Sequence, residues 1–194
     1  MTTRVQENRC LQREFPCPQL GMLEKTMLCQ ASLKTAGKVL DANVCSGPVA
    51  EYLLANTDCQ VCGVSDRMEE IRQVRETLYG GDFTYGAIGD IPWQENTFDT
   101  VLLHPSEGGE ESLREQLREC KRVLKPGGQL VLGLKSPPLV IRQLSHLLWD
   151  ETEDRLPDTQ TAQQMMKSMG FEQITRVQAA FSGHVISGWL PEEA

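Results

Sequence analysis

Hydrophobic positions along this 194-residue chain follow two alternating patterns, one with helical spacing and one of short apolar runs. Helical spacing predicts helices at residues 19–35, 49–55, 68–78, 110–124, 139–149 and 159–169. Short runs bounded by turn residues predict strands at 38–41, 59–64, 83–88, 98–103 and 129–134, with a closing antiparallel hairpin at 172–181 and 184–190. Because strands that alternate with helices are typical of βαβ units, the pattern predicts an α/β fold with a doubly wound, mostly parallel sheet.

The residues that follow each strand are the first candidates for a functional site. In doubly wound sheets, ligands bind outside the carboxyl ends of the strands, where the strand order reverses. The candidates are Asp41, Asn43, Cys45 and Gly47 after the first strand, Ser65 and Asp66 after the second, Asp90 and Ile91 after the third, and His104 after the fourth. We expect an N-terminal helical segment at 1–36 and one α/β domain at 37–194.

Charge and hydropathy narrow the range of partners. Acidic residues number 27 against 19 basic ones, which gives a formal charge of −8 and a pI near 5.0. A net acidic surface repels phosphate backbones, so a broad nucleic-acid interface is not expected. No apolar run approaches the ~20 residues of a membrane span. Residues 1–15 are polar and carry both signs of charge, so neither a signal nor a transit peptide is expected.

Seven cysteines, an odd number at irregular spacing, indicate reduced thiols rather than a disulfide framework, and so a cytoplasmic location. Cys59 and Cys62 have CxxC spacing but lie in a predicted strand, where side chains three positions apart point to opposite faces. The histidines are scattered along the chain, and a tetrahedral zinc site needs a second ligand pair at suitable spacing. We therefore expect no metal.

Several motifs together resemble the class I S-adenosylmethionine-dependent methyltransferases of the small type-11 kind. They are KVLD at 38–41 with Gly47 six residues on, GDIPW at 89–93 followed by NTFDTV at 96–101, RVLKPGGQLVL at 122–132, and KSMGF at 167–171. The resemblance covers about 37–189. It implies a Rossmann-like sheet of seven strands, the last antiparallel and beside the sixth, and S-adenosylmethionine as cofactor.

The chain departs from this family at the cofactor positions. The family's first loop usually reads Asp-x-Gly-x-Gly-x-Gly, whereas here Asn43 and Cys45 stand at the first two glycines. The resemblance implies that Asp41 orients this loop, that the acidic residue after strand two binds the ribose, and that the 90–91 segment lies beside the adenine. The ribose position falls on Ser65, with Asp66 one residue later. Each of these residues has a structural alternative, as a turn, a cap or an ordinary loop.

His104 is the candidate general base, because it ends the fourth predicted strand and imidazole titrates near neutral pH. Its alternative is a polar cap. The resulting hypothesis is an S-adenosylmethionine-dependent methyltransferase acting on a small molecule. The alternative is a catalytically inactive methyltransferase-like binding or interaction protein, and a dinucleotide oxidoreductase is disfavoured because GxGxxG is missing after strand one. Insertions after the later strands are short, so the site is either open or completed by a second subunit in a homodimer.

Overall fold

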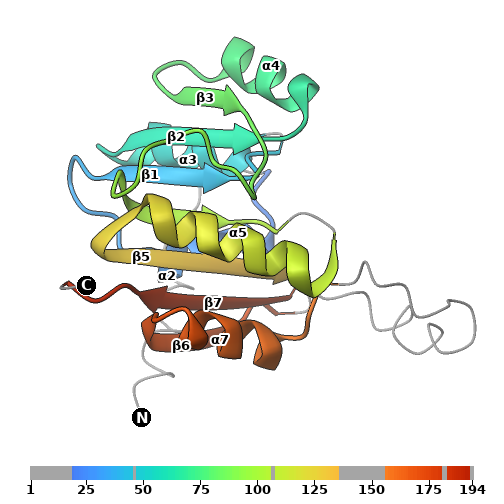
Figure 1. Cartoon of the computed structure of the whole chain (residues 1–194). Coiled ribbons are helices and arrows are strands. Elements are labelled where there is room, and N and C mark those ends of the chain that lie inside the picture. The colour runs from blue at the N-terminus through green and yellow to red at the C-terminus, as the bar shows by residue number, and fades with distance from the viewer. Residues whose placement is uncertain (1–18, 46, 106–107, 136–155, 181–182, 193–194) are drawn as a thin grey trace, which may run out of the picture.

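One mixed sheet of seven strands forms the centre of the computed structural model, which describes residues 19–45, 47–105, 108–135, 156–180 and 183–192 (Figure 1). The strands are β1 (Lys38–Ala42), β2 (Gln60–Ser65), β3 (Asp82–Tyr85), β4 (Phe98–Leu103), β5 (Leu124–Lys135), β6 (Glu172–Gln178) and β7 (Gly183–Trp189). Their order is β3-β2-β1-β4-β5-β7-β6, and only β7 runs antiparallel to its neighbours. The sequence-based prediction of the fold is therefore confirmed.

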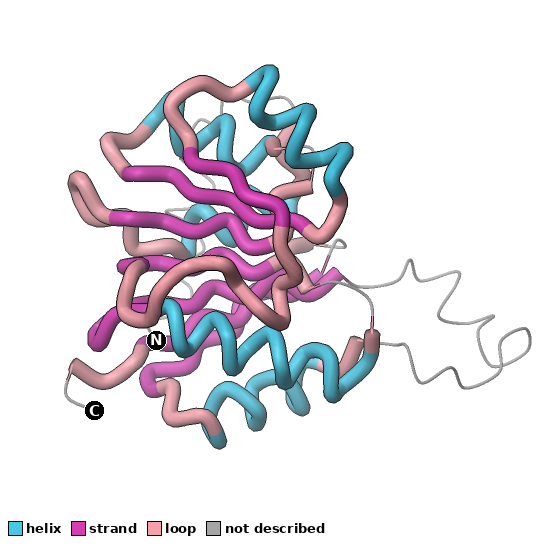
Figure 2. Tube along the Cα trace, turned by 45° about the horizontal axis from the view of Figure 1, so that its top comes forward, coloured by secondary structure: helices cyan, strands magenta, loops and turns pink. Residues whose placement is uncertain are grey.

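Helices cover both faces of the sheet. The described helices are α2 (Met22–Gln30), α3 (Pro48–Asn56), α4 (Met68–Thr77), α5 (Gly109–Val123) and α7 (Thr159–Ser168). Buried residues of α5 and α7 share one hydrophobic core with one face of the sheet, and those of α2, α3 and α4 share a second core with the other. Figure 1 shows α5 and α7 in front of the strands with α2 and α3 behind, and Figure 2 shows the strands as one layer between helices.

The strand order reverses between β1 and β4. The chain moves outward from β1 through β2 to β3, then returns to pair β4 with the other side of β1. Loops that leave the two central strands in opposite directions open a crevice at their carboxyl ends. Asp41 pairs in register with Leu102 of β4, so the last residues of β1 and the residue after β4 meet at this point.

Most element boundaries agree with the hydrophobic pattern, and two differ for physical reasons. The helix expected over 19–35 is shorter, because the chain becomes extended at Ala31. The turn expected at 125–128 lies inside β5, since Leu124 pairs with Phe98 and Gln129 pairs with Thr100. The intervening residues form a bulge in which Gly127 has a φ of +69°. The helix expected at 139–149 lies outside the described residues.

Helix α2 belongs to the same core as the sheet. Its residues Leu23, Met27 and Leu28 are buried. Met27 lies directly on Gly133 of β5, where a Cβ added at Gly133 would collide with the sulfur of Met27. This close approach brings the first turn of α2, with Glu24, to the carboxyl end of the central strands. The division of the chain at residues 36 and 37 stays a prediction, since the helix and the sheet share one hydrophobic cluster.

The described cysteines are present as thiols. Cys59 is half-buried and donates to the carbonyl of Lys34 at 3.4 Å, whereas Cys62 is buried. Within the described ranges, no three histidine, cysteine, aspartate or glutamate residues are grouped to hold a metal ion. In that same part of the chain, no helix combines the length and apolar character that crossing a membrane demands.

Candidate active site

A cavity of about 370 Å³ lies at the carboxyl ends of β1 and β4, on the face of the sheet that α2 and α3 cover. This volume is within the range of small-ligand sites, ~300–1,000 Å³. Its lining comes from six parts of the chain: Gln19, Gly21 and Glu24; Asp41, Asn43, Val44 and Cys45; Pro48 and Val49; His104 and Pro105; Gly133 and Lys135; and Leu156. Four of the sequence candidates, from two different strand ends, thus meet in one place.

Asp41 carries the most unusual group of the cavity. Its side chain is 1% exposed, and its Oδ1 atom has no hydrogen-bond partner among the described residues. The pKa of this carboxyl is raised to about 7, mainly by burial and also by the negative charge of Glu24, whereas a hydrogen bond from the backbone of Ala50 opposes the shift. An unsatisfied buried oxygen is costly, so its retention points to a ligand or a proton as its partner.

His104 follows β4 directly and faces Asp41. Its Nε2 lies 3.7 Å from Asp41 Oδ1, which is close enough for electrostatic coupling but too long for a hydrogen bond. The pKa of the imidazole is lowered to about 4, mainly by burial; Glu24 opposes the shift and Lys135 contributes to it. The ring is therefore neutral at pH 7, and Asn43 holds the backbone carbonyl of His104 with its amide at 3.0 Å.

The loop between β1 and α3 keeps a backbone conformation typical of glycine at two positions where other residues replace the family's glycines. Asn43 and Cys45 have φ angles of +73° and +49°, in the left-handed region that glycine adopts without cost. Gly47, at φ +88°, has a packing role as well, because an added Cβ would lie 2.9 Å from a methyl of Val74 in α4. The substituted loop therefore still turns toward the cavity.

The thiol of Cys45 lines the cavity in its neutral form. Burial raises its pKa to about 11, and the carboxylates of Glu70 and Asp41 contribute to the increase. A thiol with a raised pKa is a poor nucleophile, since the thiolate is the reactive species. Cys45 therefore acts here as a small apolar wall.

The two candidates after β2 lie outside this cavity. Ser65 is fully buried, and its hydroxyl donates to Glu70 Oε2 at 2.6 Å. The hydroxyl oxygen of Ser65 also accepts a hydrogen bond from the backbone N–H of Arg67 at 3.1 Å. Asp66 is exposed. A role for either residue in cofactor binding stays a prediction, although the single donor of Ser65 is already used.

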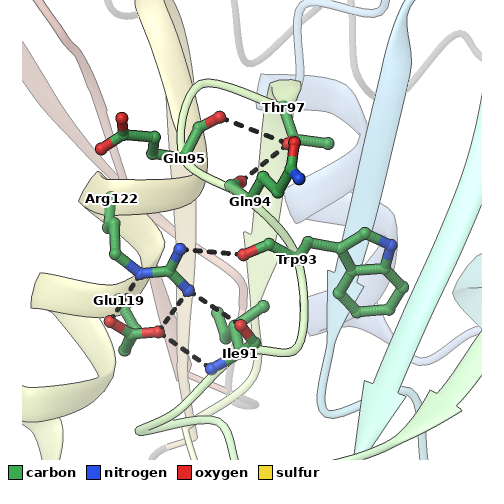
Figure 3. Close-up of polar contacts among 7 residues, drawn as sticks. All are labelled: Ile91, Trp93, Gln94, Glu95, Thr97, Glu119 and Arg122. Carbon is green, nitrogen blue, oxygen red and sulfur yellow. Dashed lines mark hydrogen bonds and ion pairs between the residues drawn. The ribbon is translucent and has the colours of Figure 1, made fainter.

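The candidates after β3 are held by a polar network. Ile91 is buried in the core; its N–H donates to Glu119 Oε2 at 2.9 Å and its carbonyl accepts from Arg122 at 2.8 Å. Arg122 also binds both Glu119 oxygens and the carbonyl of Trp93, as Figure 3 shows. Asp90 is exposed and, like Ile91, does not line the cavity. Their predicted place beside an adenine stays a prediction.

Sequence reasoning missed two charged residues of the cavity. Glu24 comes from α2 and Lys135 from the end of β5. Lys135 could have been found, because it follows from the same strand-end argument that selected His104. Glu24 could not, since its position depends on how α2 docks on Gly133, a contact between segments more than 100 residues apart.

Comparison with known proteins agrees with this geometry. Residues 40–132 match the family model described as a methyltransferase domain. The chain is similar to methyltransferase domains over just under half of its length. This segment runs from β1 into β5 and contains the cavity residues of the β1 and β4 ends. The match confirms the resemblance inferred from the motifs, and with it S-adenosylmethionine as the cofactor of a domain of this kind.

The curated relatives that the chain resembles are longer than the matched segment. A demethylmenaquinone methyltransferase of Thermotoga maritima is 29% identical over 102 residues, which are 52% of this chain and 44% of that protein. The 27-O-demethylrifamycin SV methyltransferase of Amycolatopsis mediterranei is 26% identical over 107 residues, 52% of this chain and 39% of that protein. The chain thus matches less than half the length of either relative.

A solved structure extends the likeness to nearly the whole fold. An S-adenosylmethionine-dependent methyltransferase of Thermotoga maritima superposes with a TM-score of 0.68 at 19% identity, and the match covers 95% of both chains. At this identity the likeness concerns the fold. It includes the sheet at whose reversal point the cavity lies.

The residues of the cavity fit the charges of this cofactor. S-adenosylmethionine carries a sulfonium and an amino-acid tail, and therefore both signs of charge. The cavity offers the carboxylate of Glu24 and the buried Oδ1 of Asp41, which has no partner among the described residues, to cationic groups, and the ammonium of Lys135 to a carboxylate. The turned backbone of the β1–α3 loop fits the close approach of a nucleoside.

Proposed function

We propose that this chain binds S-adenosylmethionine in the cavity at the ends of β1 and β4 and transfers its methyl group to a small-molecule acceptor. The observation that carries the proposal is the buried carboxylate oxygen of Asp41, which has no partner in the described part of the chain and faces a cavity of ligand size beside His104. An orphaned polar atom at the reversal point of a doubly wound sheet is a position where a ligand supplies the missing partner.

The small-molecule acceptor is supported by the cavity and by the names of relatives. The two relatives are named for demethylmenaquinone and for 27-O-demethylrifamycin SV, and both are small molecules. The acidic composition disfavours nucleic acid. The predicted reducing, cytoplasmic location and the predicted homodimer remain parts of this proposal; the cysteine pattern supports the first and the short insertions support the second.

The chemistry assigned to this chain is orientation and proton handling. S-adenosylmethionine supplies an electrophilic methyl group on a sulfonium. Asp41 and Glu24 stabilise positive charge in the cavity, and Lys135 binds a carboxylate. Where the acceptor must lose a proton, Asp41 is the better base, because its pKa of about 7 lies nearer the operating pH than that of His104 at about 4. Neutral His104, at 3.7 Å, then directs the acceptor toward Asp41.

An inactive interaction protein is the second candidate, and Cys45 is the observation that favours it. Its side chain stands in the cavity where the family places a glycine, so it occupies part of the volume next to the loop backbone. A measurement of cofactor binding separates the two candidates, because only the enzyme needs an accessible cofactor site.

The test is calorimetric titration of the full chain with S-adenosylhomocysteine and S-adenosylmethionine. We expect micromolar dissociation constants for the wild type and at least tenfold weaker binding for Asp41→Asn, since the amide retains the shape but removes the charge. The matched control is Asp58→Asn, because Asp58 is exposed in the loop that precedes β2, away from the carboxyl ends of the strands.

Each outcome decides between the candidates. Binding by the wild type that Asp58→Asn retains and Asp41→Asn loses supports the cofactor site. If the wild type gives no heat and no thermal shift at millimolar ligand, the methyltransferase proposal is overturned and the interaction protein is favoured. Equal affinity of wild type and Asp41→Asn would show that the cofactor binds elsewhere.

A further inference from the structure

The end of β2 holds a second carboxylate that the sequence pattern did not select. Glu70, in the first turn of α4, accepts a hydrogen bond from the buried hydroxyl of Ser65 at 2.6 Å through Oε2. Ser65 occupies the position at which related methyltransferases place an acidic residue. The structure therefore brings a carboxylate to the strand end by way of the neighbouring helix.

The hydroxyl of Ser65 is not free to donate to a ligand. A serine hydroxyl has one donor, and that of Ser65 is used by Glu70. The oxygen also accepts the backbone N–H of Arg67 at 3.1 Å, which fixes its orientation. Ser65 thus acts on Glu70 as a positioning residue, and a direct bond from Ser65 to a sugar hydroxyl would require breaking this contact.

Glu70 keeps acceptor capacity for a ligand. Its Oε1 faces the guanidinium of Arg67 at 3.6 Å, beyond hydrogen-bond distance, and the side chain is 20% exposed. Its charge also raises the pKa of the Cys45 thiol, which lines the cavity, so the carboxylate lies within electrostatic range of the β1–α3 loop. The carboxylate thus lies at the end of β2 and acts electrostatically on the cavity loop.

We propose that Glu70 is the carboxylate that accepts hydrogen bonds from the vicinal diol of a bound nucleoside, in place of a residue on β2 itself. Two sugar hydroxyls are donors that a carboxylate binds in the manner known from other doubly wound sheets, where an acidic residue near the second strand binds the ribose. The inference rests on the proposed cofactor, because it extends that ligand from the Asp41 cavity toward β2.

The test compares Glu70→Gln with Glu69→Gln, a neighbour on the same helix turn that is exposed and carries the same charge. Both variants and the wild type are titrated with S-adenosylhomocysteine and with its 2′,3′-dideoxy analogue, which lacks the diol. We expect Glu70→Gln to bind S-adenosylhomocysteine roughly 10- to 100-fold more weakly than the wild type, since charge-assisted hydrogen bonds are lost. Glu69→Gln should match the wild type.

The analogue distinguishes a direct contact from a structural effect. If Glu70 binds the diol, Glu70→Gln and the wild type bind the dideoxy analogue equally. A loss of the same size for both ligands, or no loss for either, would overturn the inference. Absence of binding by the wild type would overturn the proposed function as well, so the two failures are distinguishable. The exchange Ser65→Asp with Glu70→Ser should restore part of the affinity, because it returns a carboxylate to the strand end.

Discussion

Two polar clusters, one between α5 and the 89–97 loop and one at the carboxyl ends of β1 and β4, differ in how their hydrogen bonds are satisfied. In the first, Arg122 donates to Glu119 at 2.7 and 2.9 Å and to the carbonyls of Ile91 and Trp93 at 2.8 Å (Figure 3). In the second, Asp41 is buried with one oxygen unpartnered among the described residues. The first cluster uses its polar groups internally, whereas the second leaves one for something else.

This difference separates residues that stabilise the fold from residues that serve a ligand. The Arg122 network attaches the 89–97 loop to α5, and it holds the pKa of Glu119 below its usual range, mainly through the guanidinium. The Asp41 site does the opposite, since burial raises the pKa of its carboxyl. Polar groups that cost stability persist at functional sites, whereas satisfied groups report on structure.

The largest expected effect comes from breaking the satisfied cluster. Arg122→Met removes four hydrogen bonds. Glu119 then keeps only the N–H of Ile91, the carbonyl of Ile91 keeps only the N–H of Trp93, and the carbonyl of Trp93 loses its bond from the guanidinium. We expect a loss of about 2–3 kcal/mol in the free energy of unfolding, less than for a fully buried pair because the arginine side chain is 35% exposed. Chemical denaturation monitored by circular dichroism measures this loss.

Arg118→Met is the matched control for that experiment. Arg118 lies on the same helix, is 59% exposed and faces Glu111 at 3.6 Å. An exposed ion pair contributes little, so the change in the free energy of unfolding should stay below about 0.5 kcal/mol. Similar losses for the two variants would show that the network around Arg122 has no special role in stability.

The next effect is a pH dependence of opposite sign at Asp41 and His104. The pKa of Asp41 is about 7 in the folded chain and 3.8 as a free side chain, so between these values the folded state holds more protons and stability falls as pH rises. The pKa of His104 is about 4 against 6.5, so over that window stability rises with pH. Each slope has a limit of about 1.4 kcal/mol per pH unit.

Single substitutions expose the two slopes. Relative to the wild type, Asp41→Asn should gain stability as pH rises from 4 to 7, and His104→Gln should lose stability as pH rises from 4 to 6.5. Denaturation midpoints measured across this range give the differences. The other charged groups that face the pair, Glu24 and Lys135, are unchanged in both variants and cancel. Differences independent of pH would contradict the protonation states assigned to the cavity.

The hydrophobic pattern predicted the fold because its determinants are local. Strand β4 occurs at the residues that the apolar run indicates, and the order of strands and helices left few topologies. The same reasoning brought Asp41 and His104 together, since both lie at the carboxyl ends of central strands. The bulge at 125–128 was missed because KPGG is equally suited to a turn, and only pairing with β4 decides between the two.

The missed site residues depend on contacts that no local pattern contains. Glu24 reaches the cavity through the docking of α2 on Gly133, and Glu70 reaches β2 through its bond to Ser65. A carboxylate can thus stand near the usual place in space while its position in the sequence changes. Under the proposal for Glu70, the motif locates the end of β2, whereas the carboxylate comes from the first turn of α4.

The smallest expected effect concerns Cys45, which belongs to neither kind of cluster. Its φ of +49° is a conformation in which glycine is favoured over other residues by about 1 kcal/mol. Cys45→Gly relieves this strain but loses the packing of the thiol, so the free energy of unfolding should stay within about 1 kcal/mol of the wild type. Because the substitution also clears the cavity wall, S-adenosylhomocysteine should bind severalfold more tightly, as measured by calorimetry.

Asn43→Gly is the matched comparison for that loop substitution. Asn43 also has a positive φ, but its amide holds the carbonyl of His104 at 3.0 Å, so removing it gives up a contact that positions the site. We expect Cys45→Gly to improve cofactor affinity and Asn43→Gly to leave it unchanged or weaker. An improvement for Asn43→Gly alone would mean that the amide, and not the thiol, restricts the cofactor loop.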